Sequence, residues 1–333
     1  MTAATGSLGG ARSRPADAVT GWLKHNAWTL GLLAFLVVLL AFTKAIQPSY
    51  GPPGIQGLAS AVLPLALAAV GQAIVVISGG IDLSIGSIMA LTSVISASLM
   101  KTYPELAIAI VIGVLLLGIL IGAVNGGLVV ITRVPDIVVT LAMSFVWAGC
   151  ALLVLKTPGG AAAAWLKDLV KGPLLVEWLP KAAVVMIVLV AVIWIPLRRT
   201  RLGLSIYAIG SNQLAAFRSG VAVGRTKIAA YAVMGLFAAL GGLSLTASTG
   251  IGSPVPGGYT LQSVAAIVLG GVSLAGGRGG VFGPIVAVII LQLIRSDMTF
   301  LNVNTNLATV ANGVILIGVV MFGSLIQMRR ARA

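Results

Sequence analysis

The feature that most constrains this chain is the recurrence of apolar runs of about 20 residues, separated by polar connections. A helix of that length crosses the roughly 30 Å hydrocarbon core of a bilayer, and it satisfies its backbone N–H and C=O groups internally. Charged residues make up only 8% of the chain, whereas about a quarter of the residues in a soluble domain are charged. The sequence therefore predicts an all-α polytopic membrane protein.

We expect ten transmembrane helices, with boundaries set by the apolar runs at 27–43, 57–78, 84–100, 106–131, 137–155, 181–197, 227–249, 261–276, 280–295 and 306–326. The transmembrane domain is then 27–326, between an N-terminal tail at 1–26 and a basic C-terminal tail at 327–333. Two connections are longer than turns, at 156–180 and 198–226. With ten crossings, the two tails and the segment 198–226 share one side of the membrane.

The distribution of basic residues orients this topology. Most lysines and arginines fall on the side of the two tails and of 198–226, whereas 156–180 lies opposite with Asp168 and Glu177. By the positive-inside rule, both termini and 198–226 are cytoplasmic and 156–180 is external. The net charge of +14 then reflects orientation and affinity for anionic lipid. The chain has no basic and aromatic pattern of the kind that binds nucleic acid.

The cytoplasmic segment 198–226 contains the pattern of a short capped helix. Ser211 or Asn212 is a suitable N-cap, residues 213–219 can form about two turns, and Gly220 supplies a left-handed stop. Such a helix either covers the ends of neighbouring spans or docks a soluble partner. For docking, Ala215 and Ala216 predict a smooth surface with polar groups at its ends.

An acidic residue, Asp82, stands between two apolar runs in the stretch SGGIDLSIGS at 78–87. A carboxylate at a bilayer centre is unfavourable by at least a few kcal/mol, but at the start of a helix it accepts backbone N–H bonds. One interpretation makes Asp82 the N-cap of the helix that follows, with Gly79 and Gly80 allowing a sharp turn. The other places this turn along a translocation path, as broken helices do in transporters.

Glycines mark two further places. Gly118, Gly122 and Gly126 recur every four residues in the fourth span, which predicts a seam of close helix packing, with Asn125 beside it as an interhelical hydrogen-bonding group or a pore-facing one. The stretch 269–284, LGGVSLAGGRGGVFGP, predicts a tight connection between packed spans. It is not a phosphate-binding loop, because G-x-x-x-x-G-K-[ST] occurs nowhere in the sequence. Any ATP-driven role needs an ATPase on another polypeptide.

The sequence lacks several features that secondary carriers and enzymes commonly have. No charged residue falls near the centre of a span, which argues against a proton- or sodium-driven carrier. The motifs HExxH and GxSxG are absent, and the single cysteine, Cys150, excludes a disulfide or thiolate metal site, so an enzyme is not expected. A secondary carrier or a channel for a small polar solute remains the alternative to an ATP-driven permease.

Three stretches resemble one family. SGGIDLSIGS at 78–87, AIGSNQLAAFRSGVAVGRTKIAAYAVMG at 208–235 and AAIVLGGVSLAGGRGGVFGPIVA at 265–287 are similar to the permease subunits of ribose-type sugar ABC importers, within the sugar and branched-chain amino-acid permease group. The order and spacing fit across about 50–330. The resemblance implies a multi-pass protein of the bacterial inner membrane that forms its pathway at the interface with a second permease subunit, either a second copy or a close homologue.

The resemblance also implies partners and a substrate. ATP and Mg are used by a separate ATPase subunit, no cofactor binds this chain, and an extracytoplasmic binding protein delivers a monosaccharide or similar small polyol. The coupling helix that contacts the ATPase maps to Ser211, Asn212, Gln213, Ala215, Ala216, Arg218, Ser219 and Gly220. Gln213 stands where many relatives carry glutamate. Residues expected to face the sugar are Gln72, Asp82, Ser84, Asn125, Ser144, Trp147 and Gln262, because polar groups and an aromatic ring suit such a ligand.

Overall fold

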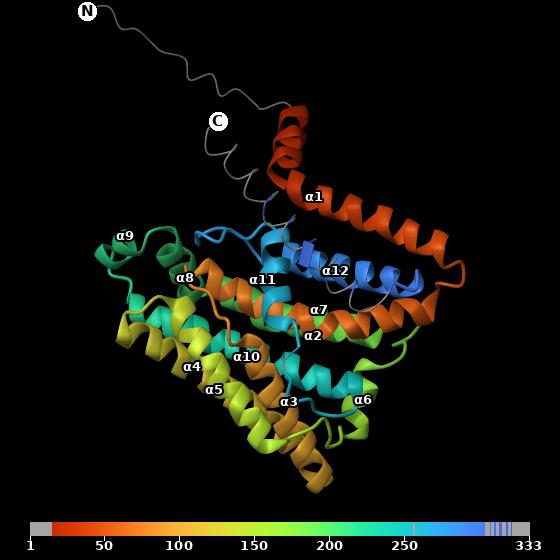
Figure 1. Ribbon diagram of the computed structural model, residues 1–333. Coiled ribbons are helices and arrows are strands. Elements are labelled where there is room, and N and C mark those ends of the chain that lie inside the picture. Colours follow the sequence, from red (N-terminus) through yellow and green to blue (C-terminus); the bar gives the residue numbers. More distant parts are fainter. Residues whose placement is uncertain are drawn as a thin grey trace, which may run out of the picture.

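The computed structural model describes residues 15–255 and 257–303, together with the single positions 307, 310, 313, 314, 318 and 321. Its regular structure within this part of the chain is helical (Figure 1). The helices are α1 Pro15–Ile46, α2 Pro52–Ile77, α3 Ile85–Thr102, α4 Ala107–Thr132, α5 Asp136–Val154, α6 Ala164–Val170, α7 Lys181–Arg199, α8 Arg201–Ser211, α9 Gln213–Arg218, α10 Val223–Thr249, α11 Tyr259–Leu269 and α12 Phe282–Phe300, with a 3₁₀ turn at Pro104–Leu106.

Within the described residues, 8 helices are long and apolar enough to cross a membrane. They correspond to the expected spans from 27–43 to 227–249 and to the span at 280–295. The expected span 261–276 is wrong in extent: α11 has 11 residues and is only about 16 Å long. It ends where Gly270 is followed by Gly271 in the left-handed region. The expected span 306–326 lies largely outside the described residues.

The predicted N-terminal tail at 1–26 contains the beginning of a helix. Helix α1 begins at Pro15, so the residues from 15 to 26 continue into the first span as a single helix. Figure 1 shows this first part of α1 set at a large angle to the apolar part that follows. Residues 1–14 and 327–333 of the predicted tails lie outside the described part of the chain.

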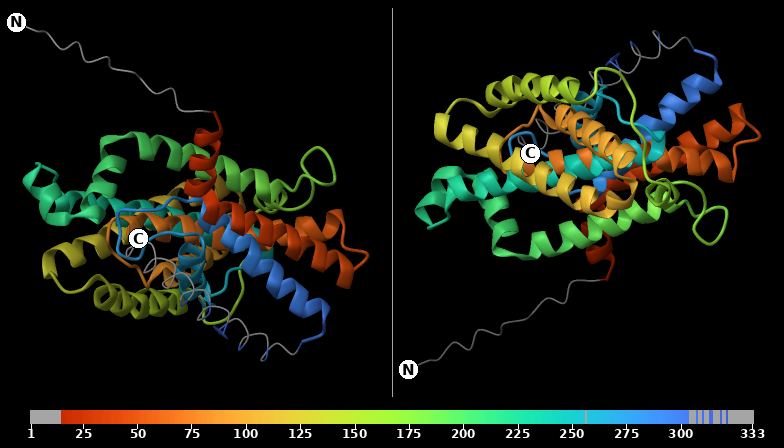
Figure 2. Two further views of the ribbon diagram at one scale, coloured as in Figure 1. Left: turned by 90° about the horizontal axis from the view of Figure 1, so that it is seen from above. Right: turned by 90° about the horizontal axis from the view of Figure 1, so that it is seen from below.

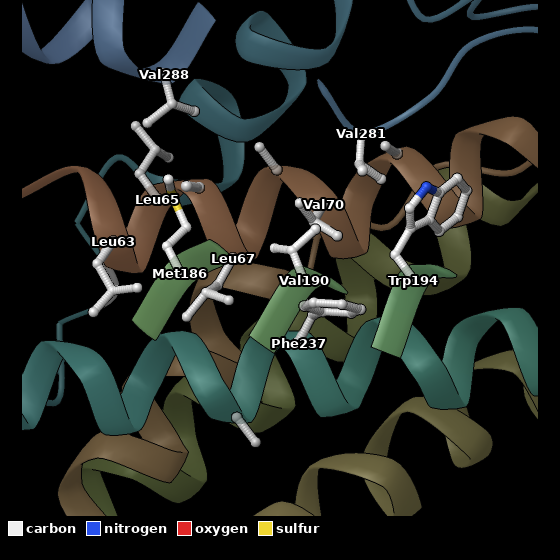
Figure 3. Close-up of a cluster of buried hydrophobic side chains, with 14 of the residues drawn as sticks. Leu63, Leu65, Leu67, Val70, Met186, Val190, Trp194, Phe237, Val281 and Val288 are labelled. Atoms are coloured by element: carbon white, nitrogen blue, oxygen red, sulfur yellow. The ribbon is translucent and has the colours of Figure 1, made fainter. Parts of the chain in front are cut away.

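The core is centred on α2, which is buried without a gap from Val62 to Ile77. Helices α7, α10, α11 and α12 all contact it. Figure 3 shows how the gaps between them are filled: Leu65 of α2 and Val288 of α12 point toward each other, while Val190 and Trp194 of α7 project from one side. A helix that is apolar on all faces and covered on all faces is expected at the centre of a membrane bundle.

Helix α4 packs closely along α10, and the glycine stripe lies at this contact. A Cβ atom on Gly118 would lie 2.5 Å from the carbonyl oxygen of Gly235, and one on Gly122 would overlap the carbonyl oxygen of Tyr231. The predicted helix-packing seam is therefore confirmed: the two backbones approach to a distance that leaves no room for side chains.

The helix ends define two opposite ends of the bundle (Figures 1 and 2). Helices α8 and α9 project at one end, close to where α2 and α4 finish. Helix α6 and the connection that follows it lie at the other end, near the beginning of α2. The segments 198–226 and 156–180 therefore sit at opposite ends of the molecule, as the predicted topology requires.

Candidate functional site

The connection between α2 and α3, residues 78–84, is a turn held inside the protein. Gly79 follows the last turn of α2 with a φ of 87°, a conformation that glycine adopts without steric penalty. Asp82 is fully buried, and its Oδ1 accepts hydrogen bonds from the backbone N–H and the hydroxyl of Ser84, each at 2.6 Å. Ser84, not Asp82, precedes the helix. The N-cap interpretation is wrong by two residues, because the carboxylate closes the turn before α3 instead of capping its first turn.

Two other predicted residues join this turn from neighbouring helices. Asn125 of α4 donates from Nδ2 to the Ser84 hydroxyl at 2.7 Å and to Asp82 Oδ2 at 3.4 Å. Its Oδ1 accepts from the indole N–H of Trp147 on α5 at 3.1 Å. Asp82, Ser84, Asn125 and Trp147 thus form one polar network that joins the turn to helices α4 and α5, which we call the break network. Asn125 is an interhelical hydrogen-bonding group in this structure.

Two threonines that sequence reasoning missed also hold the turn. The hydroxyl oxygen of Thr140 on α5 accepts from the backbone N–H of Leu83 at 3.0 Å, and that of Thr260 on α11 accepts from the N–H of Gly86 at 3.1 Å. Thr260 satisfies a backbone donor that the first turn of α3 leaves without a partner inside the helix, and Thr140 satisfies a donor in the turn before it. Single threonines in apolar helices give no sequence signal for this role.

Asp136 and Tyr231 lie against the same turn and were missed as well. The phenol of Tyr231 donates to Asp136 Oδ2 at 3.0 Å, and Lys227 Nζ lies 3.8 Å from that oxygen. A Cβ on Gly80 would lie 2.8 Å from the Tyr231 hydroxyl and would overlap the Asp136 carboxylate. The only available signal was the position of Asp136, an acidic residue directly after Pro135 at the start of a helix.

The other three predicted pathway residues do not join the break network. Ser144 donates to the carbonyl oxygen of Leu141 in its own helix, at 2.6 Å. Gln262 is half-buried on α11, with its amide beside Gly258. Gln72 is fully buried in α2, and neither its Oε1 nor its Nε2 has a hydrogen-bond partner. A buried, unpartnered amide is unfavourable by about 1–3 kcal/mol.

The predicted capped helix forms as α9. Asn212 is extended and its Oδ1 accepts from the backbone N–H of Ala215 at 2.9 Å, so of the two candidates Asn212 is the N-cap. Ser211 instead ends α8, and its hydroxyl donates to the carbonyl oxygen of Tyr207 at 2.8 Å. Gly220 has a φ of 85° just beyond α9. The predicted left-handed stop is confirmed.

The surface of α9 differs from the predicted one. Ala216 is only 6% exposed and faces the bundle, whereas Leu214 and Phe217 are 59% and 67% exposed. The smooth alanine surface is therefore wrong for Ala216, because consecutive side chains of a helix point about 100° apart and cannot both face outward when the helix packs on the bundle at Ala216. Ala215, Gln213, Arg218, Ser219 and Gly220 are exposed. The missed feature is an apolar pair, Leu214 and Phe217, three residues apart on the outer face.

Helix α8 connects this surface to the bundle. The hydroxyl of Tyr207 donates to the carbonyl oxygen of Gly279, in the connection between α11 and α12, at 2.8 Å. Burial raises the pKa of the Tyr207 phenol, and the positive charge of Arg198 opposes this shift. The phenol is therefore protonated at neutral pH and serves as the donor in this bond.

Comparison with known proteins places the chain in a family. The model of a family described as the permease component of the branched-chain amino acid transport system matches residues 54–325. The chain belongs to this family. No solved structure matches it at a significant level.

Its curated relatives are import permeases of similar length. The chain is 32% identical over 304 residues to the ribose import permease protein RbsC of Escherichia coli (strain K12), covering 89% of this chain and 92% of the relative. It is 32% identical over 295 residues to RbsC of Bacillus subtilis (strain 168), covering 86% and 90%. It is 28% identical over 313 residues to the autoinducer 2 import system permease protein LsrD of Escherichia coli O9:H4 (strain HS), covering 91% and 93%.

Proposed function

We propose that this chain is the membrane-spanning subunit of an ABC importer for a monosaccharide or similar small polyol. A binding protein outside the membrane delivers the sugar, a separate ATPase subunit hydrolyses ATP, and a second permease subunit completes the pathway. The similarity to ribose and autoinducer 2 import permeases over most of the chain supports this assignment. In this proposal the protein lies in the bacterial inner membrane with both termini in the cytoplasm.

The exposed face of α9 is the observation that supports a separate ATPase partner. Leu214 and Phe217 project from a helix that is capped by Asn212 and stopped at Gly220. Exposed apolar side chains on a short, fixed helix at the basic end of the bundle suit a protein groove better than water. Arg218 and Arg225 are exposed close by and complement an acidic rim on the partner.

The sugar pathway is proposed to pass Gln72 and the break network. In this conformation the network groups satisfy one another, whereas the Gln72 amide has both a donor and an acceptor free. An unpartnered buried amide gains the most from a sugar hydroxyl, because its desolvation is already complete. Gln72 is therefore the first residue to test for substrate contact.

The docking role is tested with Phe217→Glu, compared with Leu175→Glu, which changes an apolar residue that is 85% exposed at the opposite end. A charge in an apolar groove is unfavourable without a partner. We expect Phe217→Glu to insert normally but to lose co-purification with the ATPase and ATP-dependent sugar uptake. Leu175→Glu keeps the ATPase bound.

The result that overturns this proposal is equally direct. If Phe217→Glu retains the bound ATPase and full uptake, α9 only covers the bundle. Uptake that continues without any ATPase subunit instead indicates the secondary carrier or channel.

A further inference from the structure

Three segments far apart in the sequence meet backbone to backbone beside α9. They are the end of α2, the end of α8 and the connection between α11 and α12 (Figure 1). The N–H of Gly277 donates to the carbonyl oxygen of Ile77 at 2.9 Å. The Tyr207 hydroxyl, one turn before the end of α8, donates to the carbonyl oxygen of Gly279. We call this contact the glycine junction.

Gly210 is the residue that makes the junction possible. A Cβ on Gly210 would overlap the carbonyl oxygen of Ile77 and would lie 2.6 Å from the N of Gly277. Gly276 approaches from the third segment, where a Cβ would lie 2.8 Å from the carbonyl oxygen of Gly210 and 3.0 Å from Cα of Gly79. Atoms in such contact cannot move toward one another, so a displacement of one segment displaces the others.

The junction lies between the two regions described above. Gly210 is two residues before Asn212, the cap of α9, and the N–H of Asn212 donates to the carbonyl oxygen of Ala208 in α8. Ile77 is five residues before Asp82, and the N–H of Gly80 donates back to the carbonyl oxygen of Val75. The path from the exposed face of α9 to the buried turn 78–84 is therefore short and made of backbone hydrogen bonds and contacts.

We propose that Gly210 is a positioning residue for transport, which makes the end of α8 and the turn 78–84 move together when a partner displaces α9. This inference rests on the proposed ATPase partner. In this proposal Gly210 transfers the displacement of α9 to the end of α2. The backbone of Gly276 and Gly277 holds Ile77 in contact with α8. The substrate path at the break network then opens or closes in step with the partner.

The test uses the complete importer in proteoliposomes, with its ATPase and binding protein, and measures sugar transported per ATP hydrolysed. Gly210→Ala should keep the ATPase bound, because α9 is unchanged. Two quantities should fall by about tenfold: the stimulation of ATP turnover by sugar-loaded binding protein, and the amount of sugar transported per ATP hydrolysed. Gly113→Ala is the control for an added methyl group, since a Cβ there would meet no atom within 4 Å beyond its own stretch of helix.

A second control separates transmission from packing. Gly118→Ala introduces a similar clash, 2.5 Å from the carbonyl oxygen of Gly235, in the α4–α10 seam. It should lower the amount of folded protein while leaving the ratio of sugar to ATP at the parental value. Equal ratios for Gly210→Ala and Gly118→Ala mean that Gly210 serves packing alone, which overturns the proposal.

Tyr207→Phe tests the junction without a steric clash. It removes the bond to Gly279 and should lower the ratio of sugar to ATP severalfold with normal folding. If Gly210→Ala does not assemble, Tyr207→Phe is the deciding variant. A parental ratio of sugar transported to ATP hydrolysed in Tyr207→Phe overturns the inference. Failure of the proposed function looks different, because the ATPase then stays bound to Phe217→Glu.

Discussion

Two short turns in this protein use the same local chemistry in opposite surroundings. Asp82 accepts from the N–H of Ser84, and Asn212 accepts from the N–H of Ala215, each just before a helix. Asp82 is fully buried and its carboxylate is also bonded by Asn125, whereas Asn212 is exposed. Water can replace the bond at Asn212 but not the bonds at Asp82. The same kind of side-chain-to-backbone hydrogen bond is therefore required by the fold in one region and serves only the local helix end in the other.

The comparison also shows how each region is fixed. The turn at 78–84 is held by groups from α4, α5, α10 and α11, through residues that are up to 177 positions away in the sequence. Helix α9 is held by its own caps and by Ala216 alone facing inward. The buried turn therefore cannot change its conformation unless the helices bonded to it move as well, whereas α9 is free to adapt to a partner.

Replacing Asp82 should give the largest effect. Asp82→Leu leaves the N–H and hydroxyl of Ser84 without an acceptor, and buried unpaired donors are unfavourable by about 1–3 kcal/mol each. We expect the free energy of unfolding in detergent to fall by about 3 kcal/mol or more. Asp82→Asn keeps one acceptor oxygen and should lose less. A change of less than about 0.5 kcal/mol in the leucine variant would show that the buried turn depends no more on its side-chain bonds than the exposed one does.

Replacing Gln72 tests whether the buried region contains a polar group that serves transport and not stability. Gln72→Leu removes an amide whose two polar atoms are buried without partners, so the free energy of unfolding should rise by about 1 kcal/mol. Sugar uptake should nevertheless fall if the amide contacts the substrate. Gln292→Leu is the control, because it removes a buried amide that donates to the carbonyl oxygen of Ala61 and was not predicted to face the sugar. Higher stability with parental uptake would exclude Gln72 from the pathway.

Asn212 should give the smallest effect on stability. Asn212→Ala removes one exposed cap bond, worth about 0.5–1 kcal/mol, and α9 alone should fray. Hydrogen exchange at the amide of Ala215 should accelerate while the global unfolding midpoint stays unchanged. Asn212→Asp, which keeps the acceptor, is the matched control. A lowered global midpoint in the alanine variant would contradict the local role of this cap.

The sequence by itself determined the features that depend on neighbours within a few residues. The long apolar helices follow from run length, and the ends of α9 follow from Asn212 and Gly220, because a cap or a left-handed stop involves atoms at most one turn away. The seam of Gly118, Gly122 and Gly126 also follows from helical spacing. The break at Gly79 and Gly80 was readable, although the helix start was placed two residues early.

Only the tertiary structure decided which groups these local features meet. Nothing near Ala216 or Phe217 in the sequence says which of them faces the bundle, because that depends on how α8 and α9 pack. The contact of Gly210 with Ile77 and Gly277 joins residues more than 60 positions apart, and the partners of Asp82 and Gly80 come from separate helices. Such contacts are set by the packing of whole helices, since apolar periodicity fixes a buried face but not the residue that will lie against it.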